Sequence, residues 1–288
     1  MSVCALCRKL GMSRQNYYLR RQRRQRRQVE GELVAQLVQQ ERRLQPRLGG
    51  RKLYHLLKPE LARAGVELGR DRFFAELAQR GLLVPPLRGQ AVATTDSRHG
   101  LPVFHNLAKG KVLRGPHELW VSDLTYIRTR EGFVFLALIT DGFSRKIVGA
   151  HLDDSLESLG CQQARNQALA QLPVGSQPIH HSDRGCQYCC HDYVQPLLDR
   201  GFSVSMTETD HCAENALAER VNGILKQEYG LGGELPSKAV ARRLAPQAIE
   251  LYNTRRPHSA LGYRFPAQVH AQGAGADCPS TGSSSHCE

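Results

Sequence analysis

The sequence predicts an α/β catalytic unit, a mixed sheet flanked by helices, preceded by small all-helical units. Three strand-like runs follow one another near the middle of the chain, LWVSDLTYI, FVFLALIT and KIVGAHL. Their β-branched and aromatic residues are typical of strands. Helical and strand-like segments then alternate as far as the helical stretch ENALAERVNGILKQE. Three strands followed by such an alternation favour one sheet with helices packed against it.

The first segment, residues 1–30, has the form of a helix-turn-helix followed by a basic run. A turn at Gly11 separates two helical stretches, and Ser13 is placed to cap the second one. A plain helical hairpin fits the same pattern. The run RRQRRQRRQ comes next, and it suits either phosphate binding or a solvated extension of the helix.

Residues 31–86 predict a second helical unit, with two helices that end at Gly65 and Gly81. Arg70 and Arg72, at the start of its second helix, are candidate DNA contacts in a helix-turn-helix. A small scaffolding bundle is the alternative. Residues 87–115 show no sustained periodicity and are expected to form a linker.

The catalytic unit, residues 116–232, contains three carboxylates in distinctive surroundings. Asp123 lies in the middle of a strand-like run, Asp183 follows the short run QPIHHS, and Glu219 lies on the helical stretch. Hard cations such as Mg²⁺ take oxygen ligands, and a few carboxylates leave open positions for a phosphate. The three acids therefore predict metal-assisted phosphoryl transfer on nucleic acid.

The helix that carries Glu219 is expected to present a polar face to the metals. At 3.6 residues per turn, Asn215, Glu219, Asn222 and Lys226 share one side, and Leu217, Val221 and Ile224 lie opposite. Lys226 follows Glu219 by two turns and suits a phosphate that approaches the ions, and Asn215, Asn222 and Lys226 are candidate DNA contacts. An ordinary amphipathic surface helix would show the same pattern when it is taken alone.

Three further polar residues near the acids have open roles. Asp141 precedes a glycine in a turn, where backbone reasons alone favour aspartate, so it stays outside the triad. His180 and His181 either steer the substrate or are buried structural histidines.

A C-terminal helical and basic extension is predicted for residues 233–270, with Pro246 kinking or splitting its helix. Arg255, Arg256 and His258 lie among tyrosines, a combination that suits a DNA strand. The alternative is that these residues staple the segment to the core. Residues 271–288 are rich in Gly and Ser and are expected to be disordered.

The charge distribution favours a nucleic-acid partner. The formal net charge is +12, distributed as +16 over residues 1–116, −6 over residues 117–230 and +2 over the rest. Basic segments on both sides of an acidic metal site suit DNA, because phosphate neutralisation supplies most non-specific affinity. We find no apolar run that could span a bilayer and no secretory signal, and so expect a cytoplasmic, nucleoid-associated protein without a membrane partner.

The cysteines do not predict a disulfide framework or a zinc site. They number nine, an odd count in a chain expected to be cytosolic. Cys4 with Cys7 and Cys186 with Cys189 have the short spacing of zinc ligands, but neither pair has a second pair to complete a four-ligand set. We therefore do not expect structural zinc.

Five motifs, in order, resemble a known family: WVSDLTYI, DGFSRKIVGAHL, HSDRGCQY, ENALAERVNGILKQE and YNTRRPHSALGY. They are similar to the catalytic reading frame of bacterial insertion-sequence transposases with a retroviral-integrase-like core. The resemblance covers roughly residues 46–266. Two departures are Cys186, where serine is common, and His211-Cys212-Ala213, where a tyrosine-containing turn is common. Neither departure touches the three acids.

The resemblance implies an RNase H-like fold and a DDE triad at Asp123, Asp183 and Glu219, with Lys226 as the basic residue two turns later. It further implies two Mg²⁺ ions, with Mn²⁺ as a substitute, and cleavage followed by strand transfer at the terminal inverted repeats of an insertion sequence. The implied partners are those DNA ends, target DNA and further copies of the chain on paired ends. A product of an upstream reading frame, fused by frameshifting or bound, is a further implied partner.

Two other classes of protein stay open at this point. A structure-selective nuclease of the same fold would cut DNA without joining it, although it would not need the basic N-terminal units. An inactive transposase-derived regulator would bind DNA only, although all three acids are present.

Overall fold

The computed structural model describes residues 2–85, 101–208 and 215–274. The chain divides into two compact units, residues 1–86 and 87–288. Each unit has its own hydrophobic core, and each is described by itself.

The N-terminal unit is all-helical, with α1 (Val3–Lys9), α2 (Arg14–Leu44), α3 (Gly50–Arg63) and α4 (Arg70–Gln79). Gly11, Gly65 and Gly81 have positive φ values, and the Ser13 side chain caps α2 by accepting from the Asn16 amide. The predicted helix ends and cap are therefore confirmed.

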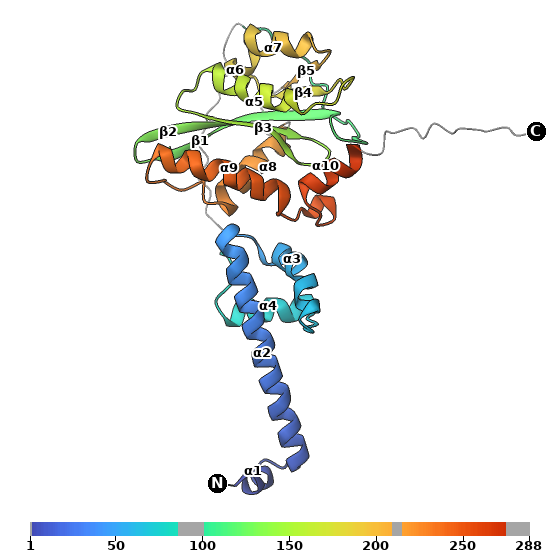
Figure 1. Cartoon of the computed structure of the whole chain (residues 1–288), viewed down its shortest axis with the longest axis vertical. Coiled ribbons are helices and arrows are strands. Elements are labelled where there is room, and N and C mark those ends of the chain that lie inside the picture. Colours follow the sequence, from blue (N-terminus) through green and yellow to red (C-terminus); the bar gives the residue numbers. More distant parts are fainter. Residues whose placement is uncertain (1, 86–100, 209–214, 275–288) are drawn as a thin grey trace, which may run out of the picture. The chain divides into compact units, whose positions relative to one another are not determined.

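The long helix α2 crosses the predicted boundary between residues 30 and 31 without a break (Figure 1). Its second half packs with α3 and α4 around Val34, Leu53 and Phe73. The basic run from Arg20 to Gln28 is helical and exposed along its whole length. The run is therefore a solvent-exposed extension of the helix, and this local structure leaves phosphate binding open.

The second unit is built on a five-stranded sheet in the order β3-β2-β1-β4-β5. The strands are β1 (Leu119–Thr129), β2 (Gly132–Asp141), β3 (Ile147–Asp153), β4 (Ile179–Ser182) and β5 (Ser203–Met206). The first three form an antiparallel meander, and β4 and β5 run parallel to β1. The predicted mixed sheet is confirmed.

Helices cover both faces of this sheet (Figure 1). Helices α5 (Ser158–Ala170), α6 (Cys186–Cys189) and α7 (His191–Leu198) pack over Trp120, Ala137 and Ile139. Helices α8 (Ala216–Glu228) and α9 (Lys238–Thr254) pack over the opposite face. A short 3₁₀ turn, Ser259–Leu261, and α10 (Pro266–Ala274) follow, so helix extends four residues into the predicted disordered tail, of which residues 275–288 lie outside the described residues.

Helix α9 is continuous although Pro246 lies inside it, so the predicted splitting of this helix does not occur. Its apolar face, including Ala241, Ala248 and Tyr252, is buried with α8 against the sheet. This packing outweighs the hydrogen bond that proline cannot make. Residues 238–254 consequently share the core of the catalytic unit.

Two further findings concern the surroundings of the sheet. Residues 101–115 contain no helix or strand, and the rest of the predicted linker lies outside the described residues. Among the helices that the structure describes, none is long and apolar enough to cross a membrane.

Gly149 gives a test of the sheet packing. A Cβ at this position would lie 2.2 Å from the Ala164 carbonyl oxygen on α5, which has little freedom to move. We expect Gly149→Ala to lower the free energy of unfolding by about 1–3 kcal/mol. Gly233→Ala, where a Cβ would meet nothing within 4 Å, is the control. Equal effects of the two substitutions in chemical denaturation would contradict the close approach of α5 to β3.

Candidate active site

The strand register brings the two aspartates to the same place. Strand β1 pairs with β4 through Leu119 with Ile179, Trp120 with His180 and Val121 with His181. Two residues further along the same register, Asp123 corresponds to Asp183. Because β4 ends at Ser182, Asp183 leaves the sheet beside the Asp123 position.

Helix α8 lies with its polar face along β1. The Asn215 side chain donates to the Ser122 carbonyl oxygen (3.0 Å), and the Asn222 side chain donates to Asp123 Oδ2 (2.6 Å). Lys226 Nζ lies 4.3 Å from the centre of the Tyr126 ring. These three contacts follow β1 in order, so Asn215, Asn222 and Lys226 share one face of the helix as predicted.

Asn215 and Asn222 are both buried, so their contacts position the helix and orient Asp123, and the predicted DNA contacts of these two amides are wrong for this structure. Glu219 lies between them in sequence on the same face, in the first turn of α8, and its side chain is exposed. Residues 209–214, which include the departure at His211-Cys212-Ala213, precede it and lie outside the described residues.

The charges of the three acids interact. Burial, together with the carboxylates of Asp183 and Glu219, raises the pKa of Asp123 to about 7 against the lowering effect of the Asn222 hydrogen bond. Burial lowers the pKa of Lys226, and the charge of Asp123 opposes this shift. A divalent cation would relieve the repulsion among three oxygen-donor side chains, so the donor set fits Mg²⁺ or Mn²⁺.

The three acids do not converge on a single point. Within residues 2–85, 101–208 and 215–274, no three His, Cys, Asp or Glu side chains form a group that could hold a metal as they stand. Of the three acids, Glu219 is the exposed one, whereas Asp123 and Asp183 are half-buried.

The raised pKa of Asp123 predicts a pH-dependent stability in the absence of metal. Since the folded state holds the proton more tightly than the unfolded chain, stability is lost as the pH rises from about 4 through about 7. We expect Asp123→Asn to be more stable than the wild type by roughly 1–3 kcal/mol at pH 8 and about equal below about pH 4. Denaturant titrations in EDTA measure this difference, and a pH-independent difference would contradict it.

The predicted DNA contacts in the C-terminal extension differ in how exposed their side chains are. Arg256 is 2% exposed and makes two charged hydrogen bonds to Glu228 (2.8 and 2.9 Å). The prediction of a DNA contact at Arg256 is wrong for this structure, because the guanidinium is enclosed in the core, and the staple alternative holds. His258 is half-buried with its ring 5.2 Å from that of Tyr252, whereas Arg255 is exposed.

In the N-terminal unit, Arg70 and Arg72 are both held by acids. Arg70 pairs with Asp71 (2.9 Å) on the surface, and Arg72 pairs with the buried Glu30 of α2 (2.5 Å). Arg72 thereby ties α4 to α2, and its side chain keeps 38% of its surface exposed.

The remaining polar residues have structural partners. His180 is buried, with Nε2 2.7 Å from Ser122 Oγ and 2.9 Å from the Tyr193 hydroxyl; burial, with the neighbouring His181, lowers its pKa to about 3. His181 Nδ1 lies 2.8 Å from Ser205 Oγ. Both histidines thus belong to the core.

Asp141 likewise faces the interior. The cysteines of the described residues belong to no group of three side chains that could bind a metal. Fully buried Asp141 accepts from the amides of His117 and Ser144 (2.7 Å each), which closes the turn after β2. Cys7 and Cys189 are buried, while Cys4 and Cys186 are exposed.

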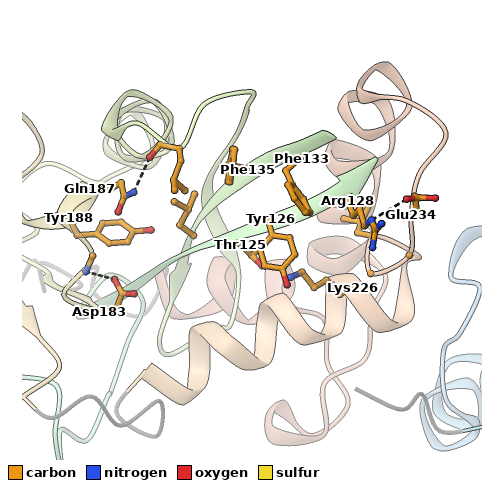
Figure 2. A pocket seen from close by; sticks show the side chains of 16 residues that line it. Thr125, Tyr126, Arg128, Phe133, Phe135, Asp183, Gln187, Tyr188, Lys226 and Glu234 are labelled. Carbon is orange, nitrogen blue, oxygen red and sulfur yellow. Dashed lines mark hydrogen bonds and ion pairs between the residues drawn. The ribbon is translucent and has the colours of Figure 1, made fainter. Parts of the chain in front are cut away.

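A cavity of about 790 Å³ opens beside Asp183, here called the β1–β2 pocket (Figure 2). Asp183 lies at one end and the Arg128–Glu234 ion pair (3.1 Å) at the other. Its principal lining residues are Tyr126, Arg128, Phe133, Phe135, Asp183 and Lys226. The motifs do not indicate the aromatic residues of this pocket, although the alternation along the two strands places them on one face.

Comparison with known proteins gives a consistent result. Two family models described as integrase core domain match residues 114–212 and 200–266. A 31 kDa protein of insertion element IS600 from Shigella sonnei is 33% identical over 91% of this chain and 96% of its own length. Transposase InsF of insertion sequence IS3A from Escherichia coli K12 is 30% identical over 93% of each chain. The HTLV-2 integrase catalytic core, solved with magnesium, is 18% identical, with a TM-score of 0.43, over 55% of this chain and 99% of its own.

Fold, site and comparisons define a polynucleotidyl transferase of the DDE transposase and integrase class, which mediates DNA transposition. Within this class, the chain belongs to the IS3 family of insertion-sequence transposases, with a retroviral-integrase-like catalytic core.

Proposed function

We propose that Asp123, Asp183 and Glu219 are the catalytic triad and that they act on the phosphodiester at the ends of an insertion sequence. The observation that carries this proposal is the β1–β4 register, which leads toward Asp123 on one strand and Asp183 just past the end of the other, while Asn222 of α8 bonds to Asp123. The negative charges of the three acids interact, and a cavity and a half-buried lysine lie beside them. This arrangement suits a phosphate that is held by cations.

The three carboxylates would hold Mg²⁺, with Mn²⁺ as a substitute, and two ions are proposed because an in-line displacement needs stabilisation at both the attacking and the leaving oxygen. When bound, the metal supplies activation of the nucleophile and charge stabilisation at the phosphate. The HTLV-2 integrase core, solved in complex with magnesium, is consistent with this choice of ion.

The chain's own residues would orient the substrate. Asn222 orients the Asp123 carboxylate through a 2.6 Å hydrogen bond. Lys226, on the same face and beside the pocket, would neutralise a phosphate oxygen near the ions. Water as nucleophile gives cleavage and a free 3′-hydroxyl. The same hydroxyl as nucleophile gives strand transfer into target DNA.

The helical unit would bind the terminal inverted repeats. The exposed basic half of α2 offers positive charge for phosphates, and Arg70, Arg72 and Arg255 are further candidate contacts. We also propose self-association on paired ends, and an upstream-frame product fused or bound to the chain. DNA as the substrate would place the protein in the cytoplasm, at the nucleoid.

A joining assay tests this function. Labelled duplexes that carry the element's own ends would be incubated with the full chain, a target plasmid and Mg²⁺ or Mn²⁺. We expect metal-dependent nicks with 3′-hydroxyl ends, and labelled strands joined to the plasmid. Cleavage without joining would instead favour a structure-selective nuclease, and DNA binding without any chemistry would favour a regulator.

A further inference from the structure

We propose that the β1–β2 pocket receives one unpaired nucleotide of a DNA end, with its base on the aromatic face and its phosphate near Lys226. The inference rests on the proposed function for the identity of the DNA. It adds a subsite next to Asp183 that would select frayed or tailed ends over closed duplex.

The first support is an aromatic stretch of the sheet that stays open to solvent. Trp120 on β1 is buried under α5 and α7. Further along the same strand face, Tyr126 lies opposite Phe135 in the register, and its ring centre is 5.4 Å from that of Phe133. Phe133 is 48% exposed. Phe133 lies toward the Arg128 end of the cavity that opens beside Asp183, and an aromatic group left open in a cavity is characteristic of a binding surface.

The second support is the open edge of β1. Strand β4 pairs with β1 only as far as Val121, and the next bridge on β1 that the described residues make outside the meander joins Thr129 to Leu235. Gly233 also lines the cavity, and a Cβ at this position would meet nothing within 4 Å. The short β4 and Gly233 therefore leave this part of the β1 edge open.

The third support is the arrangement of charge. The Lys226 ammonium lies against the Tyr126 ring, and Asp183 lies at one end of the cavity (Figure 2). An aromatic platform binds a base through stacking, and a cation beside it binds the attached phosphate. The volume of about 790 Å³ is within the range of small-molecule sites, and it accommodates a nucleotide.

These features together select the occupant. A base pair inside a duplex keeps both faces stacked on its neighbours, so only an unpaired nucleotide can offer a base to Phe133. A second copy of the chain could cover the aromatic face, but its binding would give no role to the Lys226 ammonium in the same cavity as Asp183. A nucleotide next to the reacting phosphate would use both the aromatic face, for its base, and the Lys226 cation, for its phosphate.

Equilibrium binding tests the inference with the full chain in EDTA, so that no strand is cut. Fluorescence anisotropy would compare a blunt duplex of about 20 base pairs with the same duplex bearing a short 3′ tail. The variants are Phe133→Ala, Phe133→Trp and, as a control, Leu159→Ala, which truncates an exposed apolar side chain on α5. Contacts of the helical unit with the duplex cancel in the tailed-to-blunt ratio.

We expect the wild type, Phe133→Trp and Leu159→Ala to favour the tailed duplex by about tenfold, the effect of stacking one base. Phe133→Ala should bring the ratio close to one and leave blunt-duplex affinity unchanged. A wild type without preference, or a preference that survives Phe133→Ala, would overturn the inference. A change in self-association by sedimentation, with the ratio intact, would also overturn it in favour of a second copy.

Failure of this inference can be told apart from failure of the proposed function. If the same preparations cleave and join DNA while the ratio stays at one, the subsite is absent and the transposase function stands. If no chemistry occurs but the ratio depends on Phe133, the subsite stands and the proposed catalytic role fails.

Discussion

Asp183→Asn is expected to remove strand cleavage while leaving the affinity for duplex DNA within about twofold of the wild type. The amide keeps the size of the side chain but has no negative charge for a cation, and the metal contributes several kcal/mol to the transition state. The loss in cleavage rate should therefore be at least about a thousandfold. Gel-shift titration and single-turnover cleavage measure the two quantities on one preparation.

Asp192→Asn is the matched control, because Asp192 is an exposed aspartate in α7. This variant should cleave at the wild-type rate. Loss of binding together with cleavage in Asp183→Asn would argue against a dedicated catalytic role, since the residue would then support the fold or the DNA contact.

Arg256→Ala is expected to lower the free energy of unfolding by about 3–5 kcal/mol. The substitution leaves Glu228, whose side chain is 15% exposed, without the guanidinium that makes two hydrogen bonds to it, and an uncompensated buried charge is costly. Chemical denaturation of the full chain gives the difference, provided that the two units are resolved as separate transitions.

Arg255→Ala serves as the neighbouring control, because Arg255 is exposed. Its effect on stability should stay within about 0.5 kcal/mol, as for most surface substitutions. If Arg256→Ala were fully stable but deficient in DNA binding, the enclosed ion pair would not describe the protein in solution.

Much of the fold follows from local sequence. Gly11, Gly65 and Gly81 end helices where positive φ values are required, and the alternating strand runs predict the meander. The continuity of α2 is not predicted well, because a basic run and an apolar run can belong to one helix. Pro246 misleads for a related reason, since the buried face of α9 outweighs a local preference.

The site is predictable in its composition but not in its contacts. The spacing on α8 identifies one face, and the structure adds that Asn222 bonds to Asp123 and that Lys226 contacts Tyr126. Arg256 shows the limit, because a basic residue beside tyrosines looks the same in sequence whether it meets a phosphate or Glu228. The hairpin register alone would have placed Tyr126 beside Phe135.

The most direct test of the proposed metal site is single-turnover cleavage of a labelled element end in Mg²⁺, with Glu219→Gln compared to Glu157→Gln. Glu157 is an exposed glutamate in the same unit, at the start of α5. We expect Glu219→Gln to lose cleavage by at least about a thousandfold and Glu157→Gln to cleave as the wild type does. Wild-type cleavage by Glu219→Gln would contradict the triad.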